Sequence, residues 1–168
     1  MLKILNDLSF FFEDNYRDIH VRAYAKIKRI SPPTASALLE HYCKEGLLLK
    51  ETDKRHNLYK ANRENPLFRH LQRAYWQDRL TPLLAFIEKE YLNPVVILFG
   101  SASKAEITEE SDIDLAVFTP TEKELNLEDF SRSLKRPIQL FRFDDQKSVK
   151  NPHLLANILR ATPLLRHL

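Results

Sequence analysis

The sequence predicts an α+β protein with a helix-rich N-terminal part and a smaller C-terminal part built around strands. Only two of its 168 residues are glycine, a composition typical of helix-rich chains. Apolar segments flank a charged turn within residues 47–61, which predicts a β-hairpin. The runs Val95–Phe99 and Leu115–Phe118 have the length and apolar composition of buried strands. We therefore expect one domain at residues 1–65, a helical connector at 66–93 and a second domain at 94–168.

Composition limits the class of protein and its partners. A hydrophobic content of 43% is ample for folded cores, and a net charge of +3 permits a polyanionic partner without requiring one. The single cysteine, Cys43, cannot form an internal disulfide. The sequence has no apolar run of membrane-spanning length and no signal-peptide layout. We expect a soluble cytoplasmic protein that makes no membrane contact.

Three helices are predicted before the hairpin. Leu2, Leu5, Leu8 and Phe12 have the spacing of one helical face. A second helix is expected over about residues 19–27, with Val21, Tyr24, Ala25 and Ile27 packed inward. A third helix begins after the N-cap residue Ser31 with two prolines in its first turn, and Gly46 ends it.

Three helices followed by a hairpin over Leu47–Ala61 resemble a winged helix-turn-helix domain covering about residues 1–65. The resemblance implies double-stranded DNA as a partner, with the third helix in the major groove and the hairpin tip along the backbone. The DNA-binding candidates are Thr34, Ser36, Ala37, His41 and Lys44 on the helix and Lys54, Arg55 and His56 at the tip. The helix also carries Glu40 and little positive charge, and winged helices mediate protein contacts too, so protein binding stays an alternative.

Two Xaa-Pro pairs in the connector predict where its helices begin. Asn65-Pro66 predicts an N-cap and a first-turn proline, and Thr81-Pro82 repeats the pattern. The sequence therefore predicts either two helices or one helix bent at Pro82.

The C-terminal part places chemically informative residues beside its first two strands. Gly100 follows the first strand and allows both a sharp turn and a close approach of phosphate to the main chain, and Ser101 adds a hydroxyl. Asp112 and Asp114 lie two residues apart at the beginning of the second strand, so their side chains share a face. Two neighbouring carboxylates repel each other, and a divalent cation relieves that repulsion. Either feature alone is common in purely structural roles, and the ordered combination is more specific.

This combination resembles the signature of the nucleotidyltransferase superfamily related to DNA polymerase β, in particular its minimal members. The resemblance covers about Val95 to the C-terminus. It implies that Gly100 and Ser101 hold the phosphates of an NTP and that Asp112 and Asp114 are catalytic ligands of Mg²⁺ or Mn²⁺. Lys104 stands where the family often has a basic residue and would add positive charge near the phosphates, although an exposed loop lysine is the alternative.

Two positions depart from the family pattern. Ala105 stands where members often have glycine. The third carboxylate of active members should come from the predicted strand Arg136–Phe143, where Gln139 occupies the position and cannot act as a base. Asp144 or Asp145 would substitute only if that strand were displaced. Two further helices are expected, one through Leu127, Phe130 and Leu134 and one beginning at Asn151-Pro152, with Leu164 and Leu165 packing at the tail.

Three functions are compatible with these residues. The first is a nucleotidyltransferase that moves a nucleoside monophosphate from an NTP to a hydroxyl of a protein or small molecule. The second is a DNA-binding transcriptional regulator whose inactive nucleotidyltransferase domain senses nucleotide or only forms a homodimer. The third is an antitoxin-like partner of a small helical toxin.

Overall fold

The computed structural model describes residues 2–53 and 56–165, and within it the chain forms two compact units. The first unit comprises Met1–Gln72 and Ala105–Glu109, and the second comprises Arg73–Lys104 and Glu110–Leu168. One helix, α4 (Pro66–Glu90), begins in the first unit and continues into the second. No helix in the described part of the chain combines the length and the apolar character needed to cross a bilayer.

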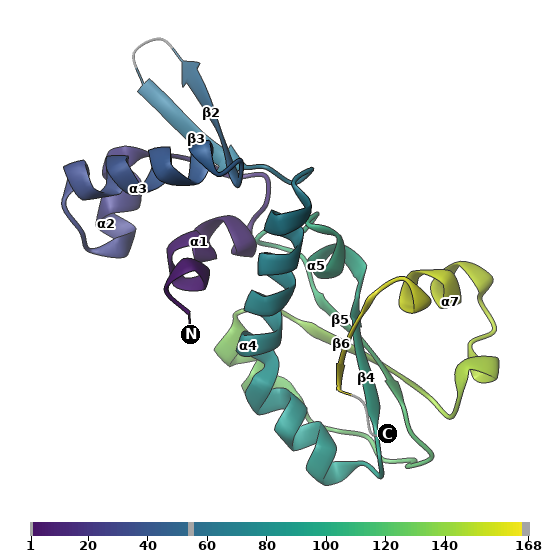
Figure 1. Cartoon of the computed structure of the whole chain (residues 1–168). Coiled ribbons are helices and arrows are strands. Elements are labelled where there is room, and N and C mark those ends of the chain that lie inside the picture. The colour runs from purple at the N-terminus through teal and green to yellow at the C-terminus, as the bar shows by residue number, and fades with distance from the viewer. Residues whose placement is uncertain (1, 54–55, 166–168) are drawn as a thin grey trace. The chain divides into compact units, whose positions relative to one another are not determined.

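The first unit holds the predicted helices and hairpin (Figure 1). Before α4 its elements are α1 (Lys3–Glu13), β1 (Asp18–His20), α2 (Val21–Lys28), α3 (Pro32–Lys44), β2 (Leu48–Asp53) and β3 (His56–Ala61). The strands form an antiparallel sheet in the order β1-β3-β2. The core of this unit contains large, fully buried side chains from the helices and from both hairpin strands. Among them are Leu8, Phe11, Phe12, Tyr24, Leu39, Leu48 and Tyr59.

Side-chain caps explain where three helices begin. The Ser31 hydroxyl accepts the Thr34 N–H at the start of α3, and the Asn65 carboxamide accepts the Leu67 N–H at 2.8 Å at the start of α4. Asn151 caps α7 (Pro152–Leu159) in the same way. Proline follows each cap because a first-turn residue needs no N–H partner within the helix. These helix starts were predicted correctly from the sequence.

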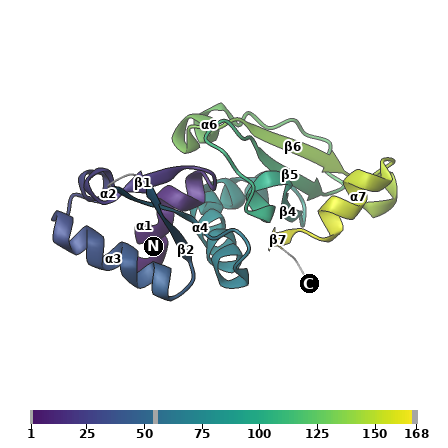
Figure 2. The same cartoon turned by 90° about the horizontal axis from the view of Figure 1, so that it is seen from above.

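The second unit is a mixed sheet with helices on both faces. After α4 its elements are β4 (Val95–Phe99), α5 (Gly100–Lys104), β5 (Ile113–Phe118), α6 (Glu128–Leu134), β6 (Ile138–Phe143), the 3₁₀ turn η1 (Gln146–Ser148), α7 and β7 (Thr162–Leu165). The strand order is β6-β5-β4-β7, with β5 and β6 parallel and the other pairs antiparallel. Within this unit, α4 and α7 lie on opposite sides of the sheet (Figures 1 and 2).

One face of this sheet carries both an apolar core and a polar end. On one face, Ile158 and Leu154 of α7 pack against Phe99, Ala116 and Phe141. Asp114 and Gln139 precede Ala116 and Phe141 by two positions, so their side chains project from the same face at the beginning of β5 and β6. On the face covered by α7, an apolar core therefore lies next to Asp114 and Gln139, the two polar residues identified from the sequence.

Several predictions about elements were wrong. Ile19 lies in β1, because it pairs with Tyr59 of β3 and does not continue α2. Ile27 was expected inward and is 53% exposed, and Leu2 precedes α1 and is 69% exposed. The connector, by contrast, follows one of its two predicted alternatives, since it is a single helix with Pro82 inside it. The tail through Leu164 pairs with β4 as β7, a strand that the sequence did not indicate.

Candidate functional site

Gly100 forms a turn that only glycine adopts without strain. Its φ is +69°, in the left-handed region, and it links the end of β4 to the short helix α5. The Ser103 hydroxyl donates to the Gly100 carbonyl at 2.9 Å. The residues after Gly100 form one helical turn, which this local bond closes, and Ala102 and Ser103 are buried.

Asp114 lies directly against Gly100. In the sheet, Asp114 pairs with Phe99 on one side and with Gln139 on the other. A Cβ added to Gly100 would meet the Asp114 Oδ2 atom at 2.0 Å, far inside van der Waals contact. The missing side chain at position 100 thus provides the space that the carboxylate fills.

Asp112 completes the acidic pair. It precedes β5 by one residue, is half-buried like Asp114, and lies close enough to influence the ionisation of Asp114. The structure therefore brings together Gly100, Asp112 and Asp114, which are up to fourteen positions apart in the sequence.

Gln139 lies at the position predicted for the third acid of the site. It is the β6 residue in register with Asp114, and its side-chain amide donates to the Asp112 Oδ2 atom. The register agrees with the position assigned to Gln139 from the sequence. An amide at this position donates a hydrogen bond to the Asp112 carboxylate and adds no negative charge to the site.

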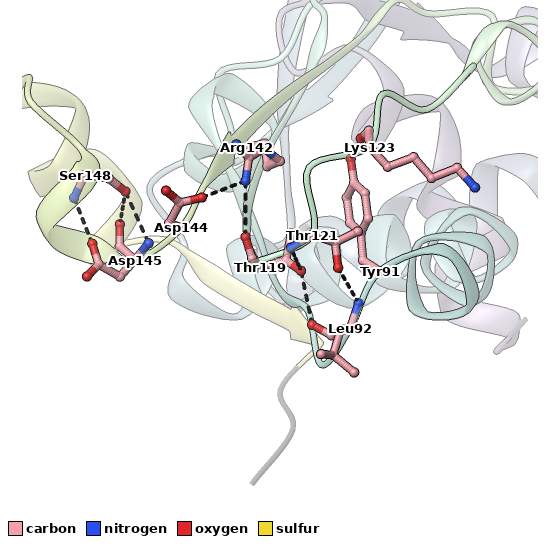
Figure 3. Close-up of polar contacts among 9 residues, drawn as sticks. All are labelled: Tyr91, Leu92, Thr119, Thr121, Lys123, Arg142, Asp144, Asp145 and Ser148. Carbon is pink, nitrogen blue, oxygen red and sulfur yellow. Dashed lines mark hydrogen bonds and ion pairs between the residues drawn. The ribbon is translucent and has the colours of Figure 1, made fainter.

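The two downstream acids lie elsewhere. Asp144 follows β6 and accepts from the Arg142 guanidinium at 2.7 Å, and Asp145 caps η1 by accepting the Ser148 N–H at 2.9 Å (Figure 3). Asp144 stands five residues beyond Gln139, about 16 Å along an extended strand. β6 is not displaced, so the alternative that Asp144 or Asp145 replaces the third acid is wrong.

Ser101 and Lys104 extend the site along α5. Ser101 is half-buried beside Gly100, and Lys104 is exposed at the end of the helix. The Lys104 ammonium donates to the Asn157 carboxamide of α7 at 3.3 Å. Asn157 was not identified from the sequence, where a lone asparagine in an amphipathic helix carries no signal.

The environment of Asp114 penalises its charge. Burial raises the pKa of the Asp114 carboxyl, and the neighbouring charge of Asp112 raises it further. Both effects oppose a carboxylate at this position when no cation is bound. A divalent cation between the two acids would reverse the second effect.

The donor set fits a nucleotide-bound magnesium ion. Mg²⁺ commonly takes one or two carboxylates from the protein and completes its octahedral shell with phosphate oxygens and water. Asp112 and Asp114 would supply the carboxylates, and the side-chain-free Gly100 lies in contact with Asp114. The described residues contain no group of three or more His, Cys, Asp or Glu side chains suited to a metal, so the other ligands would come from the nucleotide and solvent.

Asp114→Asn is expected to stabilise the protein at pH 7 without metal, by about 0.5 kcal/mol, the scale of like-charged neighbours in a sheet. Because the folded pKa is raised, the folded state binds protons more tightly than the unfolded chain, and the unfolding free energy falls as pH rises through that window. The advantage of asparagine should therefore vanish toward pH 3. Urea unfolding at several pH values measures it.

Asp78→Asn is the matched control, since it removes an exposed carboxylate from α4. It should change the unfolding free energy little at either pH. An equal gain in both variants would mean that net charge, rather than the Asp112–Asp114 pair, accounts for the effect.

The DNA-binding candidates of α3 form one exposed stripe with one exception. Thr34, Ala37, His41 and Lys44 are exposed, whereas Ser36 is half-buried. The Thr34 hydroxyl lies 2.8 Å from the Ser31 hydroxyl and so takes part in the helix cap. Lys54 and Arg55 lie outside the described residues, and no side-chain position is described for His56.

The carboxylate of Glu40 accepts hydrogen bonds from other residues of the first unit. It accepts from the Lys50 ammonium of β2 and the Tyr59 hydroxyl of β3, both at 2.6 Å. These hydrogen bonds lower the pKa of Glu40. The negative charge on α3 is therefore paired with the hairpin, and the exposed stripe itself carries no acid between Thr34 and Lys44.

A separate recess of about 630 Å³ lies on the other face of the second sheet. It is lined by Tyr91, Lys123, Leu140 and Arg142, among others, and the Tyr91 hydroxyl closes one side by donating to the Lys123 carbonyl at 2.7 Å (Figure 3). Leu140 and Arg142 alternate with Gln139 along β6, so they project away from the acids. The recess is thus distinct from the Gly100–Asp112–Asp114 site.

A comparison with known protein families matches the segment of the chain that contains the Gly100–Asp112–Asp114 site. Residues 85–165 match the family model described as "Polymerase beta, Nucleotidyltransferase". The matched segment, called the nucleotidyltransferase segment below, contains Gly100, Asp112, Asp114 and Gln139. Its match supports the nucleotidyltransferase superfamily and a transferase type of activity. Searches of curated proteins and of solved structures gave no match.

Proposed function

We propose that the nucleotidyltransferase segment binds an NTP together with Mg²⁺ or Mn²⁺ and transfers a nucleoside monophosphate to a hydroxyl of a protein or small molecule. The observation that carries the proposal is the contact of Asp114 with Gly100, beside Asp112. It joins a turn suited to phosphate with a pair of metal-binding acids, and the family match covers both.

Each residue has a distinct role in this proposal. Gly100 leaves the main chain open to the phosphates, the Ser101 hydroxyl donates to them, and Lys104 contributes positive charge from the end of α5. Asp112 and Asp114 hold the metal-bound triphosphate in place. A metal bound there would neutralise phosphate charge and would favour in-line displacement of pyrophosphate by the acceptor oxygen.

Transfer of radiolabel from an α-labelled NTP tests this proposal. The full chain with Mg²⁺ should label a hydroxyl acceptor, and Asp112→Ala with Asp114→Ala should stop the labelling. Label that still appears at the wild-type rate in this double variant would contradict the assigned roles.

The bond from Gln139 to Asp112 favours a second function, a DNA-binding regulator whose nucleotide site is slow or inactive in transfer. A glutamine cannot take the proton from an acceptor hydroxyl. In this alternative the nucleotide is a sensed ligand, and the first unit recognises double-stranded DNA as a winged helix. Saturable NTP binding without any label transfer would support it.

DNA binding by the first unit predicts a specific effect of Lys44→Ala. Loss of one phosphate contact should weaken binding across sequences and reduce the slope of log K against log[salt] by about one. Lys89→Ala removes an exposed lysine from the second unit and should leave the slope unchanged. Fluorescence anisotropy with duplex DNA at several salt concentrations measures both, and equal slopes in the two variants would argue against α3 as the DNA-contacting helix.

A further inference from the structure

The segment Ala105–Glu109 joins the two halves of the candidate nucleotide site. It follows Gly100, Ser101 and Lys104, and it precedes Asp112 and Asp114. Although both halves belong to the second unit, this segment groups with the first unit. Its central residue, Ile107, is completely buried.

Asn15 holds Ile107 by two hydrogen bonds. The Asn15 N–H donates to the Ile107 carbonyl, and the Asn15 Oδ1 atom accepts the Ile107 N–H, each at 2.9 Å. The Asn15 amide group in turn donates to the Phe11 carbonyl at 2.8 Å and to the Gln72 Oε1 atom at 2.7 Å. Asn15 is 2% exposed and Gln72 is 1% exposed, so these bonds form away from solvent. Buried amide bonds of this kind fix both partners firmly, because an unpaired group there is costly.

A second set of contacts holds Glu109. The Asp14 Oδ2 atom accepts the Glu109 N–H at 3.2 Å, while Oδ1 accepts the Tyr16 N–H at 2.9 Å. The Arg17 guanidinium pairs with the Glu109 carboxylate at 2.9 Å. Three residues within four positions, Asp14, Asn15 and Arg17, thus hold a segment more than ninety positions later in the sequence.

The backbone at the first residue of this segment is strained. Ala105 has φ +59°, a left-handed conformation that favours glycine, and it is buried. Such a conformation persists where the surrounding contacts impose it. The bonds to Ile107 and Glu109 supply contacts of this kind immediately after Ala105.

We propose that Asn15 is a positioning residue for nucleotide binding: it fixes the Ala105–Glu109 segment and thereby the path of the chain that connects the Gly100 turn to the two acids. Asp14 supports it through Glu109. Both residues lie outside the segment that matches the family model. This inference rests on the proposed function, because it names nucleotide affinity as the property that Asn15 controls.

The test compares Asn15→Ala with Asn62→Ala in the full chain. Asn62 also makes a side-chain bond to a backbone carbonyl of the first unit, to Gly46 at 2.7 Å, and this bond does not involve residues 105–109. Both variants are titrated with Mg²⁺·ATP by calorimetry at a temperature where circular dichroism shows them folded. Asn15→Ala should weaken binding at least ~10-fold, whereas Asn62→Ala should stay within about twofold of wild type.

Hydrogen exchange without nucleotide gives an independent readout. In Asn15→Ala, the amides of Ile107 and Glu109 and those of residues 100–104 and 113–115 should exchange faster than in Asn62→Ala. Asp14→Asn keeps the shape of the side chain and should produce the same pattern to a smaller extent, which serves if Asn15→Ala does not fold.

The outcomes separate the two proposals. Equal affinities and equal exchange in the Asn15 and Asn62 variants would overturn the positioning role. If wild type binds no nucleotide while Asn15→Ala still speeds exchange at residues 100–104 and 113–115, the proposed function fails and the positioning of those residues stands. Faster exchange confined to residues 107–109, with wild-type affinity, would reduce Asn15 to a local structural contact.

Discussion

Gly100→Ala should abolish Mg²⁺-dependent NTP binding and lower the unfolding free energy by about 2–4 kcal/mol. The new methyl group would require a left-handed backbone, since φ is +69°, and would lie 2.0 Å from the Asp114 Oδ2 atom. Either the strand shifts or Asp114 turns away, and both remove the carboxylate from the turn. Urea unfolding and calorimetric titration with NTP and Mg²⁺ measure the two effects.

The second glycine of the chain is a matched control. Gly46 has φ +73°, and a Cβ there would meet only the Asn65 Nδ2 atom, at 3.2 Å, among its close neighbours. Gly46→Ala should cost about 1–2 kcal/mol for the backbone alone and should leave nucleotide affinity unchanged. If Gly100→Ala binds nucleotide as tightly as Gly46→Ala does, Gly100 does not form part of the site.

Gln139→Glu should tighten Mg²⁺·NTP binding at least ~10-fold and raise the rate of label transfer by about 10²-fold or more, the usual range for a general base. The substitution keeps the shape of the side chain and places a third carboxylate opposite Asp114. It also removes the amide that donates to Asp112, leaving that carboxylate available to metal. Without metal, three neighbouring carboxylates should lower the unfolding free energy.

Gln139→Ala distinguishes the effect of the added carboxylate from the effect of losing the amide that bonds to Asp112. It frees Asp112 without adding an acid, so it should affect metal affinity but not the rate of transfer. A Glu variant that binds metal no better than the Ala variant would show that position 139 does not face the metal. A Glu variant with tighter binding and an unchanged transfer rate would indicate that proton removal is not the step limited by Gln139.

Much of the fold was predictable because local chemistry determines it. Ser31, Asn65 and Asn151 each precede proline, and each caps a helix through short-range hydrogen bonds that a sequence displays directly. The strand β4 is a continuous apolar run, and β5 is apolar except for Asp114. The alternation of residues 136–143 predicted β6, and the resemblance to the nucleotidyltransferase superfamily assigned Gln139 to the position of the third acid.

The rest depends on contacts between distant residues. The short strand β1 exists because Asp18–His20 pairs with β3, and β7 contains a proline and pairs with β4 across a register shift. α5 spans five residues, too few for a helical period to show. The exposure of Ile27 and the pairing of Glu40 with the hairpin also follow from tertiary packing.

The candidate site divides in the same way. Gly100, Asp112 and Asp114 were identified from residue type and spacing, and the structure adds their contact. Asn157 beside Lys104 and Asn15 beside Ile107 were not foreseen, because nothing local distinguishes one asparagine from another. Such support comes from residues up to ninety-five positions away.

The central claim is that Gly100, Asp112 and Asp114 together bind a metal–nucleotide complex. Calorimetric titration of the full chain with ATP, with and without Mg²⁺, tests it most directly when repeated with Asp112→Asn and with Asp114→Asn. We predict saturable binding by wild type that requires Mg²⁺ and is lost in both variants, although Asp114→Asn is the more stable protein. Undetectable binding by wild type for any of the common NTPs, or Mg²⁺-dependent binding that survives both substitutions, would contradict the account.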